Sequence, residues 1–142
     1  MSNEAEGKMG EVRKKATYIG APACFALKQC CQIVNDAFGS YGCYQVGSSL
    51  ERPDWRDVDV RFIMEDEKFW GLFPDASEHS WEFDPRWLLL TVAISGWMKQ
   101  VTGLPIDFQI QPQTHANERH PGPRNSIGLR IRKATGGQDA GE

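Results

Sequence analysis

Apolar residues recur at helical spacing in two segments of the chain. The first segment begins near Pro22, which the first turn of a helix tolerates, and ends at Gly39, a residue suited to a C-terminal cap. The second follows Asp84-Pro85, a favourable N-cap and first-turn pair, and ends at Gly103. The pattern predicts two amphipathic helices, and the second is nearly apolar enough to be buried on two sides. Their apolar positions are Leu27, Cys30, Cys31, Val34, Ala37 and Phe38 in the first helix and Leu90, Ile94, Trp97 and Val101 in the second.

Alternation of apolar and polar residues predicts strands in three further segments. These are a short strand in "CYQVGSS" that ends at a Gly-Ser turn, a second in "DVDVRFIM", and a third in "LPIDFQIQPQ". Residues 65–83 are interpreted as a loop with one short helix, and residues 114–133 as turn-rich, then basic, with a final short strand. The polar faces carry Asp57, Asp59 and Arg61 in the second strand and Asp107, Gln109 and Gln111 in the third.

The order of these elements predicts an α/β (α+β) fold with a small mixed sheet of three to five strands flanked by helices. A chain of 142 residues has the size of one domain. Residues 17–133 are expected to form it, because residues 1–16 are charged and residues 134–142 are Gly-rich and acidic, as in mobile tails.

Charge and hydropathy exclude several broad classes of function. The net charge is −3, from 16 basic and 19 acidic side chains, so no overall field attracts nucleic acid or an anionic membrane. No apolar run reaches the roughly 20 residues of a membrane span, and the polar N-terminus is unlike a signal peptide. We expect a cytoplasmic protein without a membrane partner. Its four cysteines lack metal-site spacing and are expected to be reduced, buried thiols that act as small hydrophobes.

Two carboxylates in the second predicted strand suggest chemistry. Asp57 and Asp59 are two residues apart, so their side chains point the same way, about 7 Å apart at the backbone. If the strand of Asp107 lies alongside, three carboxylates form an oxygen-only cluster suited to Mg²⁺ or Mn²⁺. The Gly47-Ser48-Ser49 turn offers a backbone that approaches closely, with hydroxyl and N–H donors for phosphate oxygens. Metal and phosphate sites together indicate phosphoryl or nucleotidyl transfer.

This arrangement resembles the nucleotidyltransferase fold of the DNA polymerase β superfamily, and most closely its minimal nucleotidyltransferases. The resemblance covers residues 21–112 and rests on Gly47-Ser48, then eight residues, then Asp57-Val58-Asp59-Val60, and later Ile106-Asp107-Phe108. It implies that Asp57 and Asp59 are metal ligands and that Asp107 is the third ligand or the base. It also implies that Gly47 and Ser48 contact the triphosphate of a nucleotide.

The chain departs from the family pattern in two respects. The spacer between Ser48 and Asp57 is shorter than in many minimal members and lacks their usual serine before the first aspartate, so Arg52 or Arg56 could supply a missing phosphate contact. The helical domain of larger members is also missing, so acceptor recognition is expected from the C-terminal segment or from another subunit.

The implied reaction moves a nucleoside monophosphate from a nucleoside triphosphate to a hydroxyl of a small molecule, a protein or an RNA end. One alternative is a non-catalytic module that binds a nucleotide or a helical partner protein, as in toxin–antitoxin pairs. Another is a structural protein with a wet sheet face. Two smaller questions stay open: whether Trp55 stacks on a base or anchors its loop, and whether the basic segment Arg124, Arg130, Arg132 and Lys133 contacts phosphate or is a solvated edge.

Overall fold

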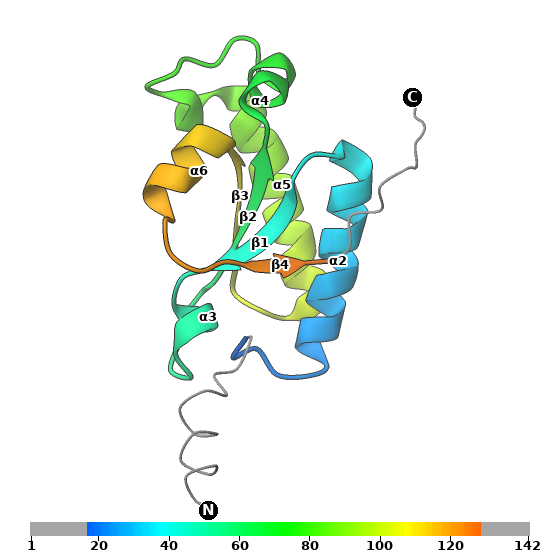
Figure 1. Cartoon of the computed structure of the whole chain (residues 1–142). Helices are drawn as coiled ribbons and strands as arrows, with labels where there is room; N and C mark the ends of the chain where they lie inside the picture. Colours follow the sequence, from blue (N-terminus) through cyan, green and yellow to red (C-terminus); the bar gives the residue numbers. More distant parts are fainter. Residues whose placement is uncertain (1–16, 129–142) are drawn as a thin grey trace, which may run out of the picture.

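A four-stranded mixed sheet forms the centre of the protein (Figure 1). The structure, a computed structural model, describes residues 17–128. The strand order is β3-β2-β1-β4, in which β1 is antiparallel to β2 and β4, and β2 is parallel to β3. The predicted fold class, a small mixed sheet with flanking helices, is confirmed. The strands are β1 (Gly42–Val46), β2 (Val58–Met64), β3 (Ile106–Pro112) and β4 (Asn125–Ile127).

Both predicted long helices are present, and their ends follow from local chemistry. In α2 (Ala23–Phe38) the last turn closes at Gly39, whose φ of 59° is left-handed and whose N–H donates to the Asn35 carbonyl. In α5 (Pro85–Thr102) the Asp84 side chain caps the first turn, and Gly103 with φ of 73° ends the helix. The shorter helices are α3 (Ser48–Glu51), α4 (Asp66–Leu72), the 3₁₀ helix η1 (Trp81–Phe83) and α6 (Gln113–Arg119).

One face of the sheet carries the hydrophobic core. The alternating apolar residues of β2 and β3 pack against α2 and α5, with the Phe38 and Phe62 rings 5.6 Å apart. This burial follows from the apolar faces that the sequence pattern predicts. The core includes Leu27, Cys30, Cys31 and Val34 of α2, Val58, Val60, Phe62 and Met64 of β2, Trp87 and Met98 of α5, and Ile106, Phe108 and Ile110 of β3.

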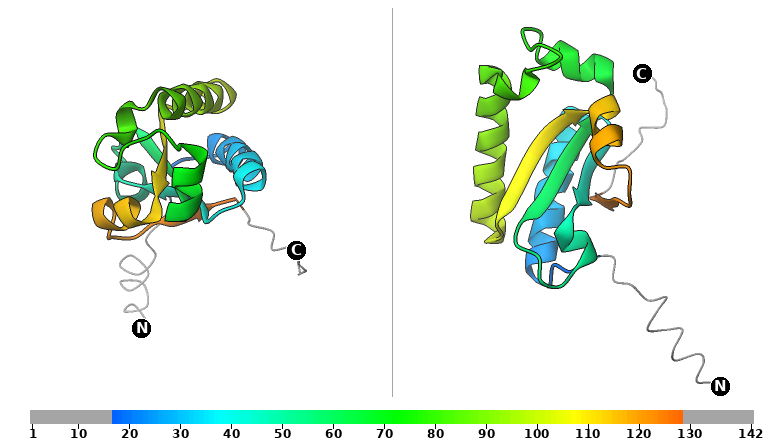
Figure 2. Two further views of the ribbon diagram at one scale, coloured as in Figure 1. Left: turned by 90° about the horizontal axis from the view of Figure 1, so that it is seen from above. Right: turned by 90° about the vertical axis from the view of Figure 1, so that its left-hand side faces the viewer.

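The opposite face of the sheet is covered over only part of its length. Helix α6 lies on the other side of the sheet from α5 (Figure 2) and packs against β2 and β3 through the fully buried Ala116. Under it, Arg61 and Gln111 are buried even though both belong to the predicted polar face. Toward the start of the same strands, Asp59 is half-buried and Asp107 is exposed. Asp59 and Asp107, together with the half-buried Gln109, are therefore the polar residues of β2 and β3 that remain accessible on this face.

Helix α5 buries one face, and apolar side chains on its other faces are exposed. Its inner face holds Trp87, Thr91 and Met98, whereas Leu89 and Val92 are 74% and 64% exposed. Val101, predicted to lie on the buried stripe, is 48% exposed. Among residues 17–128 the sheet packs against one side of this helix only, so its outer apolar side chains face solvent.

Other sequence predictions fare differently. The four cysteines are free thiols, three of them buried, and burial raises the pKa of Cys43 well above its ordinary value. The short final strand is β4, whereas the segment 65–83 forms both α4 and η1 instead of one short helix. Within the described range, no helix combines the length and the apolar character needed to cross a membrane. The predicted tails, and Arg130, Arg132 and Lys133, lie outside the described residues.

Candidate functional site

Two of the predicted carboxylates meet on the accessible part of the sheet. Because β2 and β3 are parallel neighbours, Asp59 and Asp107 are direct partners in the strand register. Their carboxylates lie within hydrogen-bonding reach of each other. The two residues are far apart in sequence, so the pairing of the strands alone brings them together.

Asp57 lies at the margin of this pair. It precedes the first residue of β2 and is exposed, yet its charge still acts on Asp59. Within residues 17–128, no three His, Cys, Asp or Glu side chains are grouped so as to hold a metal ion by themselves. The expected three-carboxylate cluster is therefore a close pair with a third carboxylate nearby.

Arg61 occupies the space beside the pair. Its Nη2 lies 3.3 Å from Asp107 Oδ2 and 4.0 Å from Asp59 Oδ1. Its Nη1 donates to the main-chain carbonyls of Asp107 at 2.7 Å and Val60 at 3.2 Å. The sequence places Arg61 on the same strand face as Asp59, but the face alone did not indicate that its guanidinium neutralises the carboxylates.

The protonation of Asp59 reflects these neighbours. Burial raises its pKa from the ordinary 3.8; the Arg61 guanidinium lowers it, and the charges of Asp107 and Asp57 raise it again. The net direction is upward, so the folded protein holds a proton on Asp59 more tightly than a solvated aspartate would. An additional positive charge near Asp59 would therefore stabilise the ionised form of its carboxylate.

The Gly47 turn lies directly against Asp59. Val46, the last residue of β1, is the register partner of Asp59, and Gly47 follows with φ 81° and ψ −159°. A Cβ atom at Gly47 would overlap Asp59 Oδ2, so only glycine permits this close approach. Ser48 then begins α3, where the first N–H groups of a helix lack partners within it. The predicted phosphate turn and the predicted carboxylates therefore adjoin each other.

Ser49 does not have an accessible hydroxyl. The residue is fully buried, and its Oγ accepts a hydrogen bond of 2.8 Å from Gln45 Nε2. Its main-chain carbonyl accepts from the N–H of Tyr18. The Ser49 side chain thus holds α3 against β1, and its predicted role in phosphate binding is reduced to what its backbone can offer.

The loop from α3 to β2 carries the two candidate phosphate arginines. Arg52 and Arg56 are both exposed, and Arg52 pairs with Asp54 at 3.4 Å. Trp55 in the same loop donates from Nε1 to the Tyr18 carbonyl at 3.1 Å, which favours the anchoring interpretation of this residue. The two arginines therefore lie on an exposed loop next to the Gly47 turn.

Residues beyond β3 add positive charge to this face. Arg124 lies with its guanidinium 5.8 Å from the Tyr44 ring centre and donates to Asn117 Oδ1 at 2.6 Å. Tyr44 is the register partner of Arg61, so Arg124 and Arg61 belong to the same side of the sheet. Burial lowers the pKa of His120, and the charge of Arg61 lowers it further. Sequence reasoning left Arg124 open and gave Tyr44 no role, because it did not predict α6.

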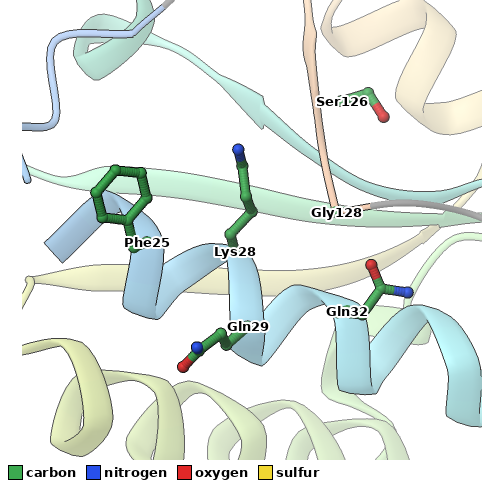
Figure 3. A pocket seen from close by; sticks show the side chains of 6 residues that line it. All are labelled: Phe25, Lys28, Gln29, Gln32, Ser126 and Gly128. Carbon is green, nitrogen blue, oxygen red and sulfur yellow. The ribbon is translucent and has the colours of Figure 1, made fainter. Parts of the chain in front are cut away.

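Cavities elsewhere have different chemistry. One of about 580 Å³ lies between α2 and the edge strand β4 (Figure 3), and none of the residues 17–128 that line it is acidic. The lining includes Phe25, Lys28, Gln29, Gln32, Ser126 and Gly128. This cavity does not combine a phosphate turn with carboxylates, so the candidate site remains the face around Asp59.

The pair Asp59–Asp107 fits a divalent cation by its donor chemistry. Mg²⁺ is commonly bound by one or two carboxylates together with substrate phosphates and water, and does not need an all-protein cage. The repulsion from the like charges that raise the pKa of Asp59 is what a cation would relieve.

Comparisons with protein-family models, with curated proteins and with solved structures gave no match.

Proposed function

We propose that this protein is a divalent-metal-dependent nucleotidyltransferase, which moves a nucleoside monophosphate from a nucleoside triphosphate to an acceptor hydroxyl. The observation that carries the proposal is the juxtaposition of Asp59, its register partner Asp107 and the Gly47 turn. Each of these features alone is common in sheets. Together they bring carboxylate oxygens next to a backbone that can approach a phosphate group closely.

Each residue has a distinct part in this proposal. Asp59 and Asp107 would hold Mg²⁺ or Mn²⁺, with Asp57 as a further ligand. When bound, the ion supplies charge stabilisation for the phosphoryl group in transfer. Gly47 and the Ser48 hydroxyl face the phosphate oxygens. Asp107, whose side chain is 49% exposed, is accessible to an acceptor and takes the proton of the attacking hydroxyl.

The positive groups extend the same scheme. Arg52, Arg56 and Arg124 are the residues that can meet the outer phosphates or a charged acceptor, since all three border the face of the carboxylates or its adjoining loop. Charge-assisted hydrogen bonds from arginine are a common means of positioning phosphate. The acceptor itself is a small molecule, a protein or an RNA end.

Thermal unfolding with each of the four ribonucleoside triphosphates, with and without Mg²⁺, tests the proposal. At a ligand concentration about 100 times its dissociation constant, native-state binding adds roughly 2.7 kcal/mol of stability. We expect a metal-dependent shift that is lost in the Asp59→Asn/Asp107→Asn double variant. The shift should persist in Asp75→Asn, which changes a carboxylate that is 78% exposed and pairs with Arg86.

A second assay, carried out after the binding measurement, measures the transfer of labelled nucleoside monophosphate to a small molecule, a protein or an RNA end. A shift that survives in the double variant would show that the nucleotide binds elsewhere and would contradict the proposal. Absence of a shift with every triphosphate would contradict it as well.

A second candidate function is nucleotide binding without turnover. It is favoured by Arg61, which supplies a protein cation beside the carboxylates. A shift that needs no metal and yields no product would support this candidate over the enzyme.

A further inference from the structure

Arg61 is the buried positive group of the candidate site. Its side chain is only 9% exposed, although it carries a full charge, and its Nε has no hydrogen-bond partner among residues 17–128. Burying an arginine is unfavourable unless its charge and its donors are compensated. Here the compensation comes from the two carboxylates that the proposed function assigns to the metal.

The backbone fixes the position of the guanidinium. Nη1 donates to the carbonyls of Val60, on its own strand, and Asp107, on the neighbouring strand. These acceptors are part of the sheet and do not move with the side chains. An ion that approaches Asp59 and Asp107 therefore meets a cation that is held in place next to both of them.

The charge balance follows from these contacts. Asp59, Asp107 and Arg61 together carry one net negative charge, whereas the two carboxylates alone carry two. A divalent ion is attracted less by the first set, and it is repelled directly by the guanidinium a few ångströms from its ligand oxygens. A nucleoside triphosphate reverses the balance, because it brings several negative charges of its own to the same place.

We infer that Arg61 acts as a built-in counter-cation that keeps the affinity of the carboxylate pair for a free divalent ion low, so that the metal enters with the triphosphate. The inference rests on the proposed function and names Arg61 as a positioning residue for metal uptake. It also accounts for the close approach of the two carboxylates, because the guanidinium offsets part of their mutual repulsion.

Mn²⁺ binding measured by calorimetry, in the absence of nucleotide, tests the inference directly. We expect Arg61→Gln to bind free Mn²⁺ about tenfold or more tightly than the wild type, because a nearby like charge is removed. Arg61→Lys keeps the charge and should keep the weak binding. Arg119→Gln, which removes an exposed arginine of α6, is the matched control and should leave the affinity unchanged.

The same titration with a non-hydrolysable triphosphate present completes the test. For the wild type we expect nucleotide to strengthen Mn²⁺ binding strongly, and we expect a smaller gain in Arg61→Gln. This comparison needs only the wild type if Arg61→Gln fails to fold. A wild type that binds free Mn²⁺ as tightly as it binds Mn²⁺ with nucleotide overturns the inference.

The remaining outcomes separate the inference from the proposed function. If folded Arg61→Gln binds free Mn²⁺ as weakly as the wild type, while nucleotide still promotes metal binding, the role of Arg61 is refuted and the proposed function stands. If neither protein binds Mn²⁺ with or without nucleotide, both are refuted. Loss of the tighter binding when Asp59→Asn is added to Arg61→Gln locates the ion at this pair.

Discussion

Replacing Gly47 with alanine tests the close approach of the turn to Asp59. At φ 81° and ψ −159° the residue lies in a backbone region that is essentially restricted to glycine, where other residues cost about 1–3 kcal/mol. The added Cβ would also overlap Asp59 Oδ2, so the carboxylate must leave its place near Arg61. This overlap adds about 1 kcal/mol, the low end of the cost of overpacking, because the atom that must move is the end of a flexible side chain. We expect Gly47→Ala to lose about 3 kcal/mol of unfolding free energy.

Gly103→Ala is the control for this estimate. Gly103 has a similar φ of 73°, but no atom of the described residues lies within 4 Å of the position of its Cβ. Left-handed backbone alone costs alanine about 1–2 kcal/mol. Urea unfolding followed by circular dichroism gives both free energies. For a domain of this size the difference should also appear as a larger drop in melting temperature, at roughly 3–4 °C per kcal/mol.

A double-mutant cycle separates the contact from the backbone strain. In the Asp59→Ala background the overlap is gone, so Gly47→Ala should cost about 1 kcal/mol less than in the wild type. If Gly47→Ala costs no more than Gly103→Ala, and the cycle shows no coupling, the reasoning about this contact is wrong.

Two further substitutions test the electrostatics and the capping. Asp59→Asn should stabilise the protein at pH 7. The folded state raises the pKa of Asp59 above the ordinary 3.8, so ionising this carboxylate lowers the free energy of unfolding. This loss appears as pH rises from the ordinary pKa to the raised pKa of the folded state, and it persists at higher pH. The gain should vanish below about pH 4 in urea unfolding, and an equal gain at every pH would contradict this. Asp84→Ala should lose about 1–2 kcal/mol of unfolding free energy, because Asp84 Oδ2 accepts from the N–H groups of Arg86 and Trp87. Thermal unfolding measures the loss, with Asp75→Ala as the control. Equal losses in the two variants would contradict the capping role of Asp84.

The parts of the fold that the sequence predicts are those encoded by neighbouring residues. Asp84-Pro85 and Gly103 delimit α5 because capping depends on groups within one turn. The alternation in β2 and β3 identifies the core face for the same reason. It also allowed the conditional prediction that Asp107 meets the carboxylates of β2, which required only that the two strands be neighbours.

Helix α6 escaped prediction because its sequence carries almost no hydrophobic signal. Of its seven residues only Ala116 is buried, so there is no periodic apolar stripe to detect. Because this helix was not predicted, the surroundings of Arg61 at the site were not predicted either. Arg61 belongs to β2, which packs against this helix, and its Nη1 donates to the carbonyl of Asp107, 46 residues away.

The exposed face of α5 and the buried hydroxyl of Ser49 show a different limit. An apolar residue such as Leu89 is compatible with burial, yet no element of residues 17–128 covers it. The sequence pattern does not reveal which apolar side chains are left uncovered. Similarly, a serine after glycine can face a ligand or the interior. Its partner Gln45 decides this, and a buried glutamine on the core side of a strand has no signature in the pattern.

The parallel pairing of β2 and β3 also has a consequence for the order of folding. The hairpin of β1 and β2 joins nearby residues, whereas β3 can add to β2 only after the chain through α4 and α5 has closed a long loop. Asp59 and Asp107 are therefore separate in the unfolded chain and in any early hairpin. We expect their mutual repulsion to oppose mainly the late steps of folding. Arg61, already on β2, can then form its contacts with Asp107 as β3 docks.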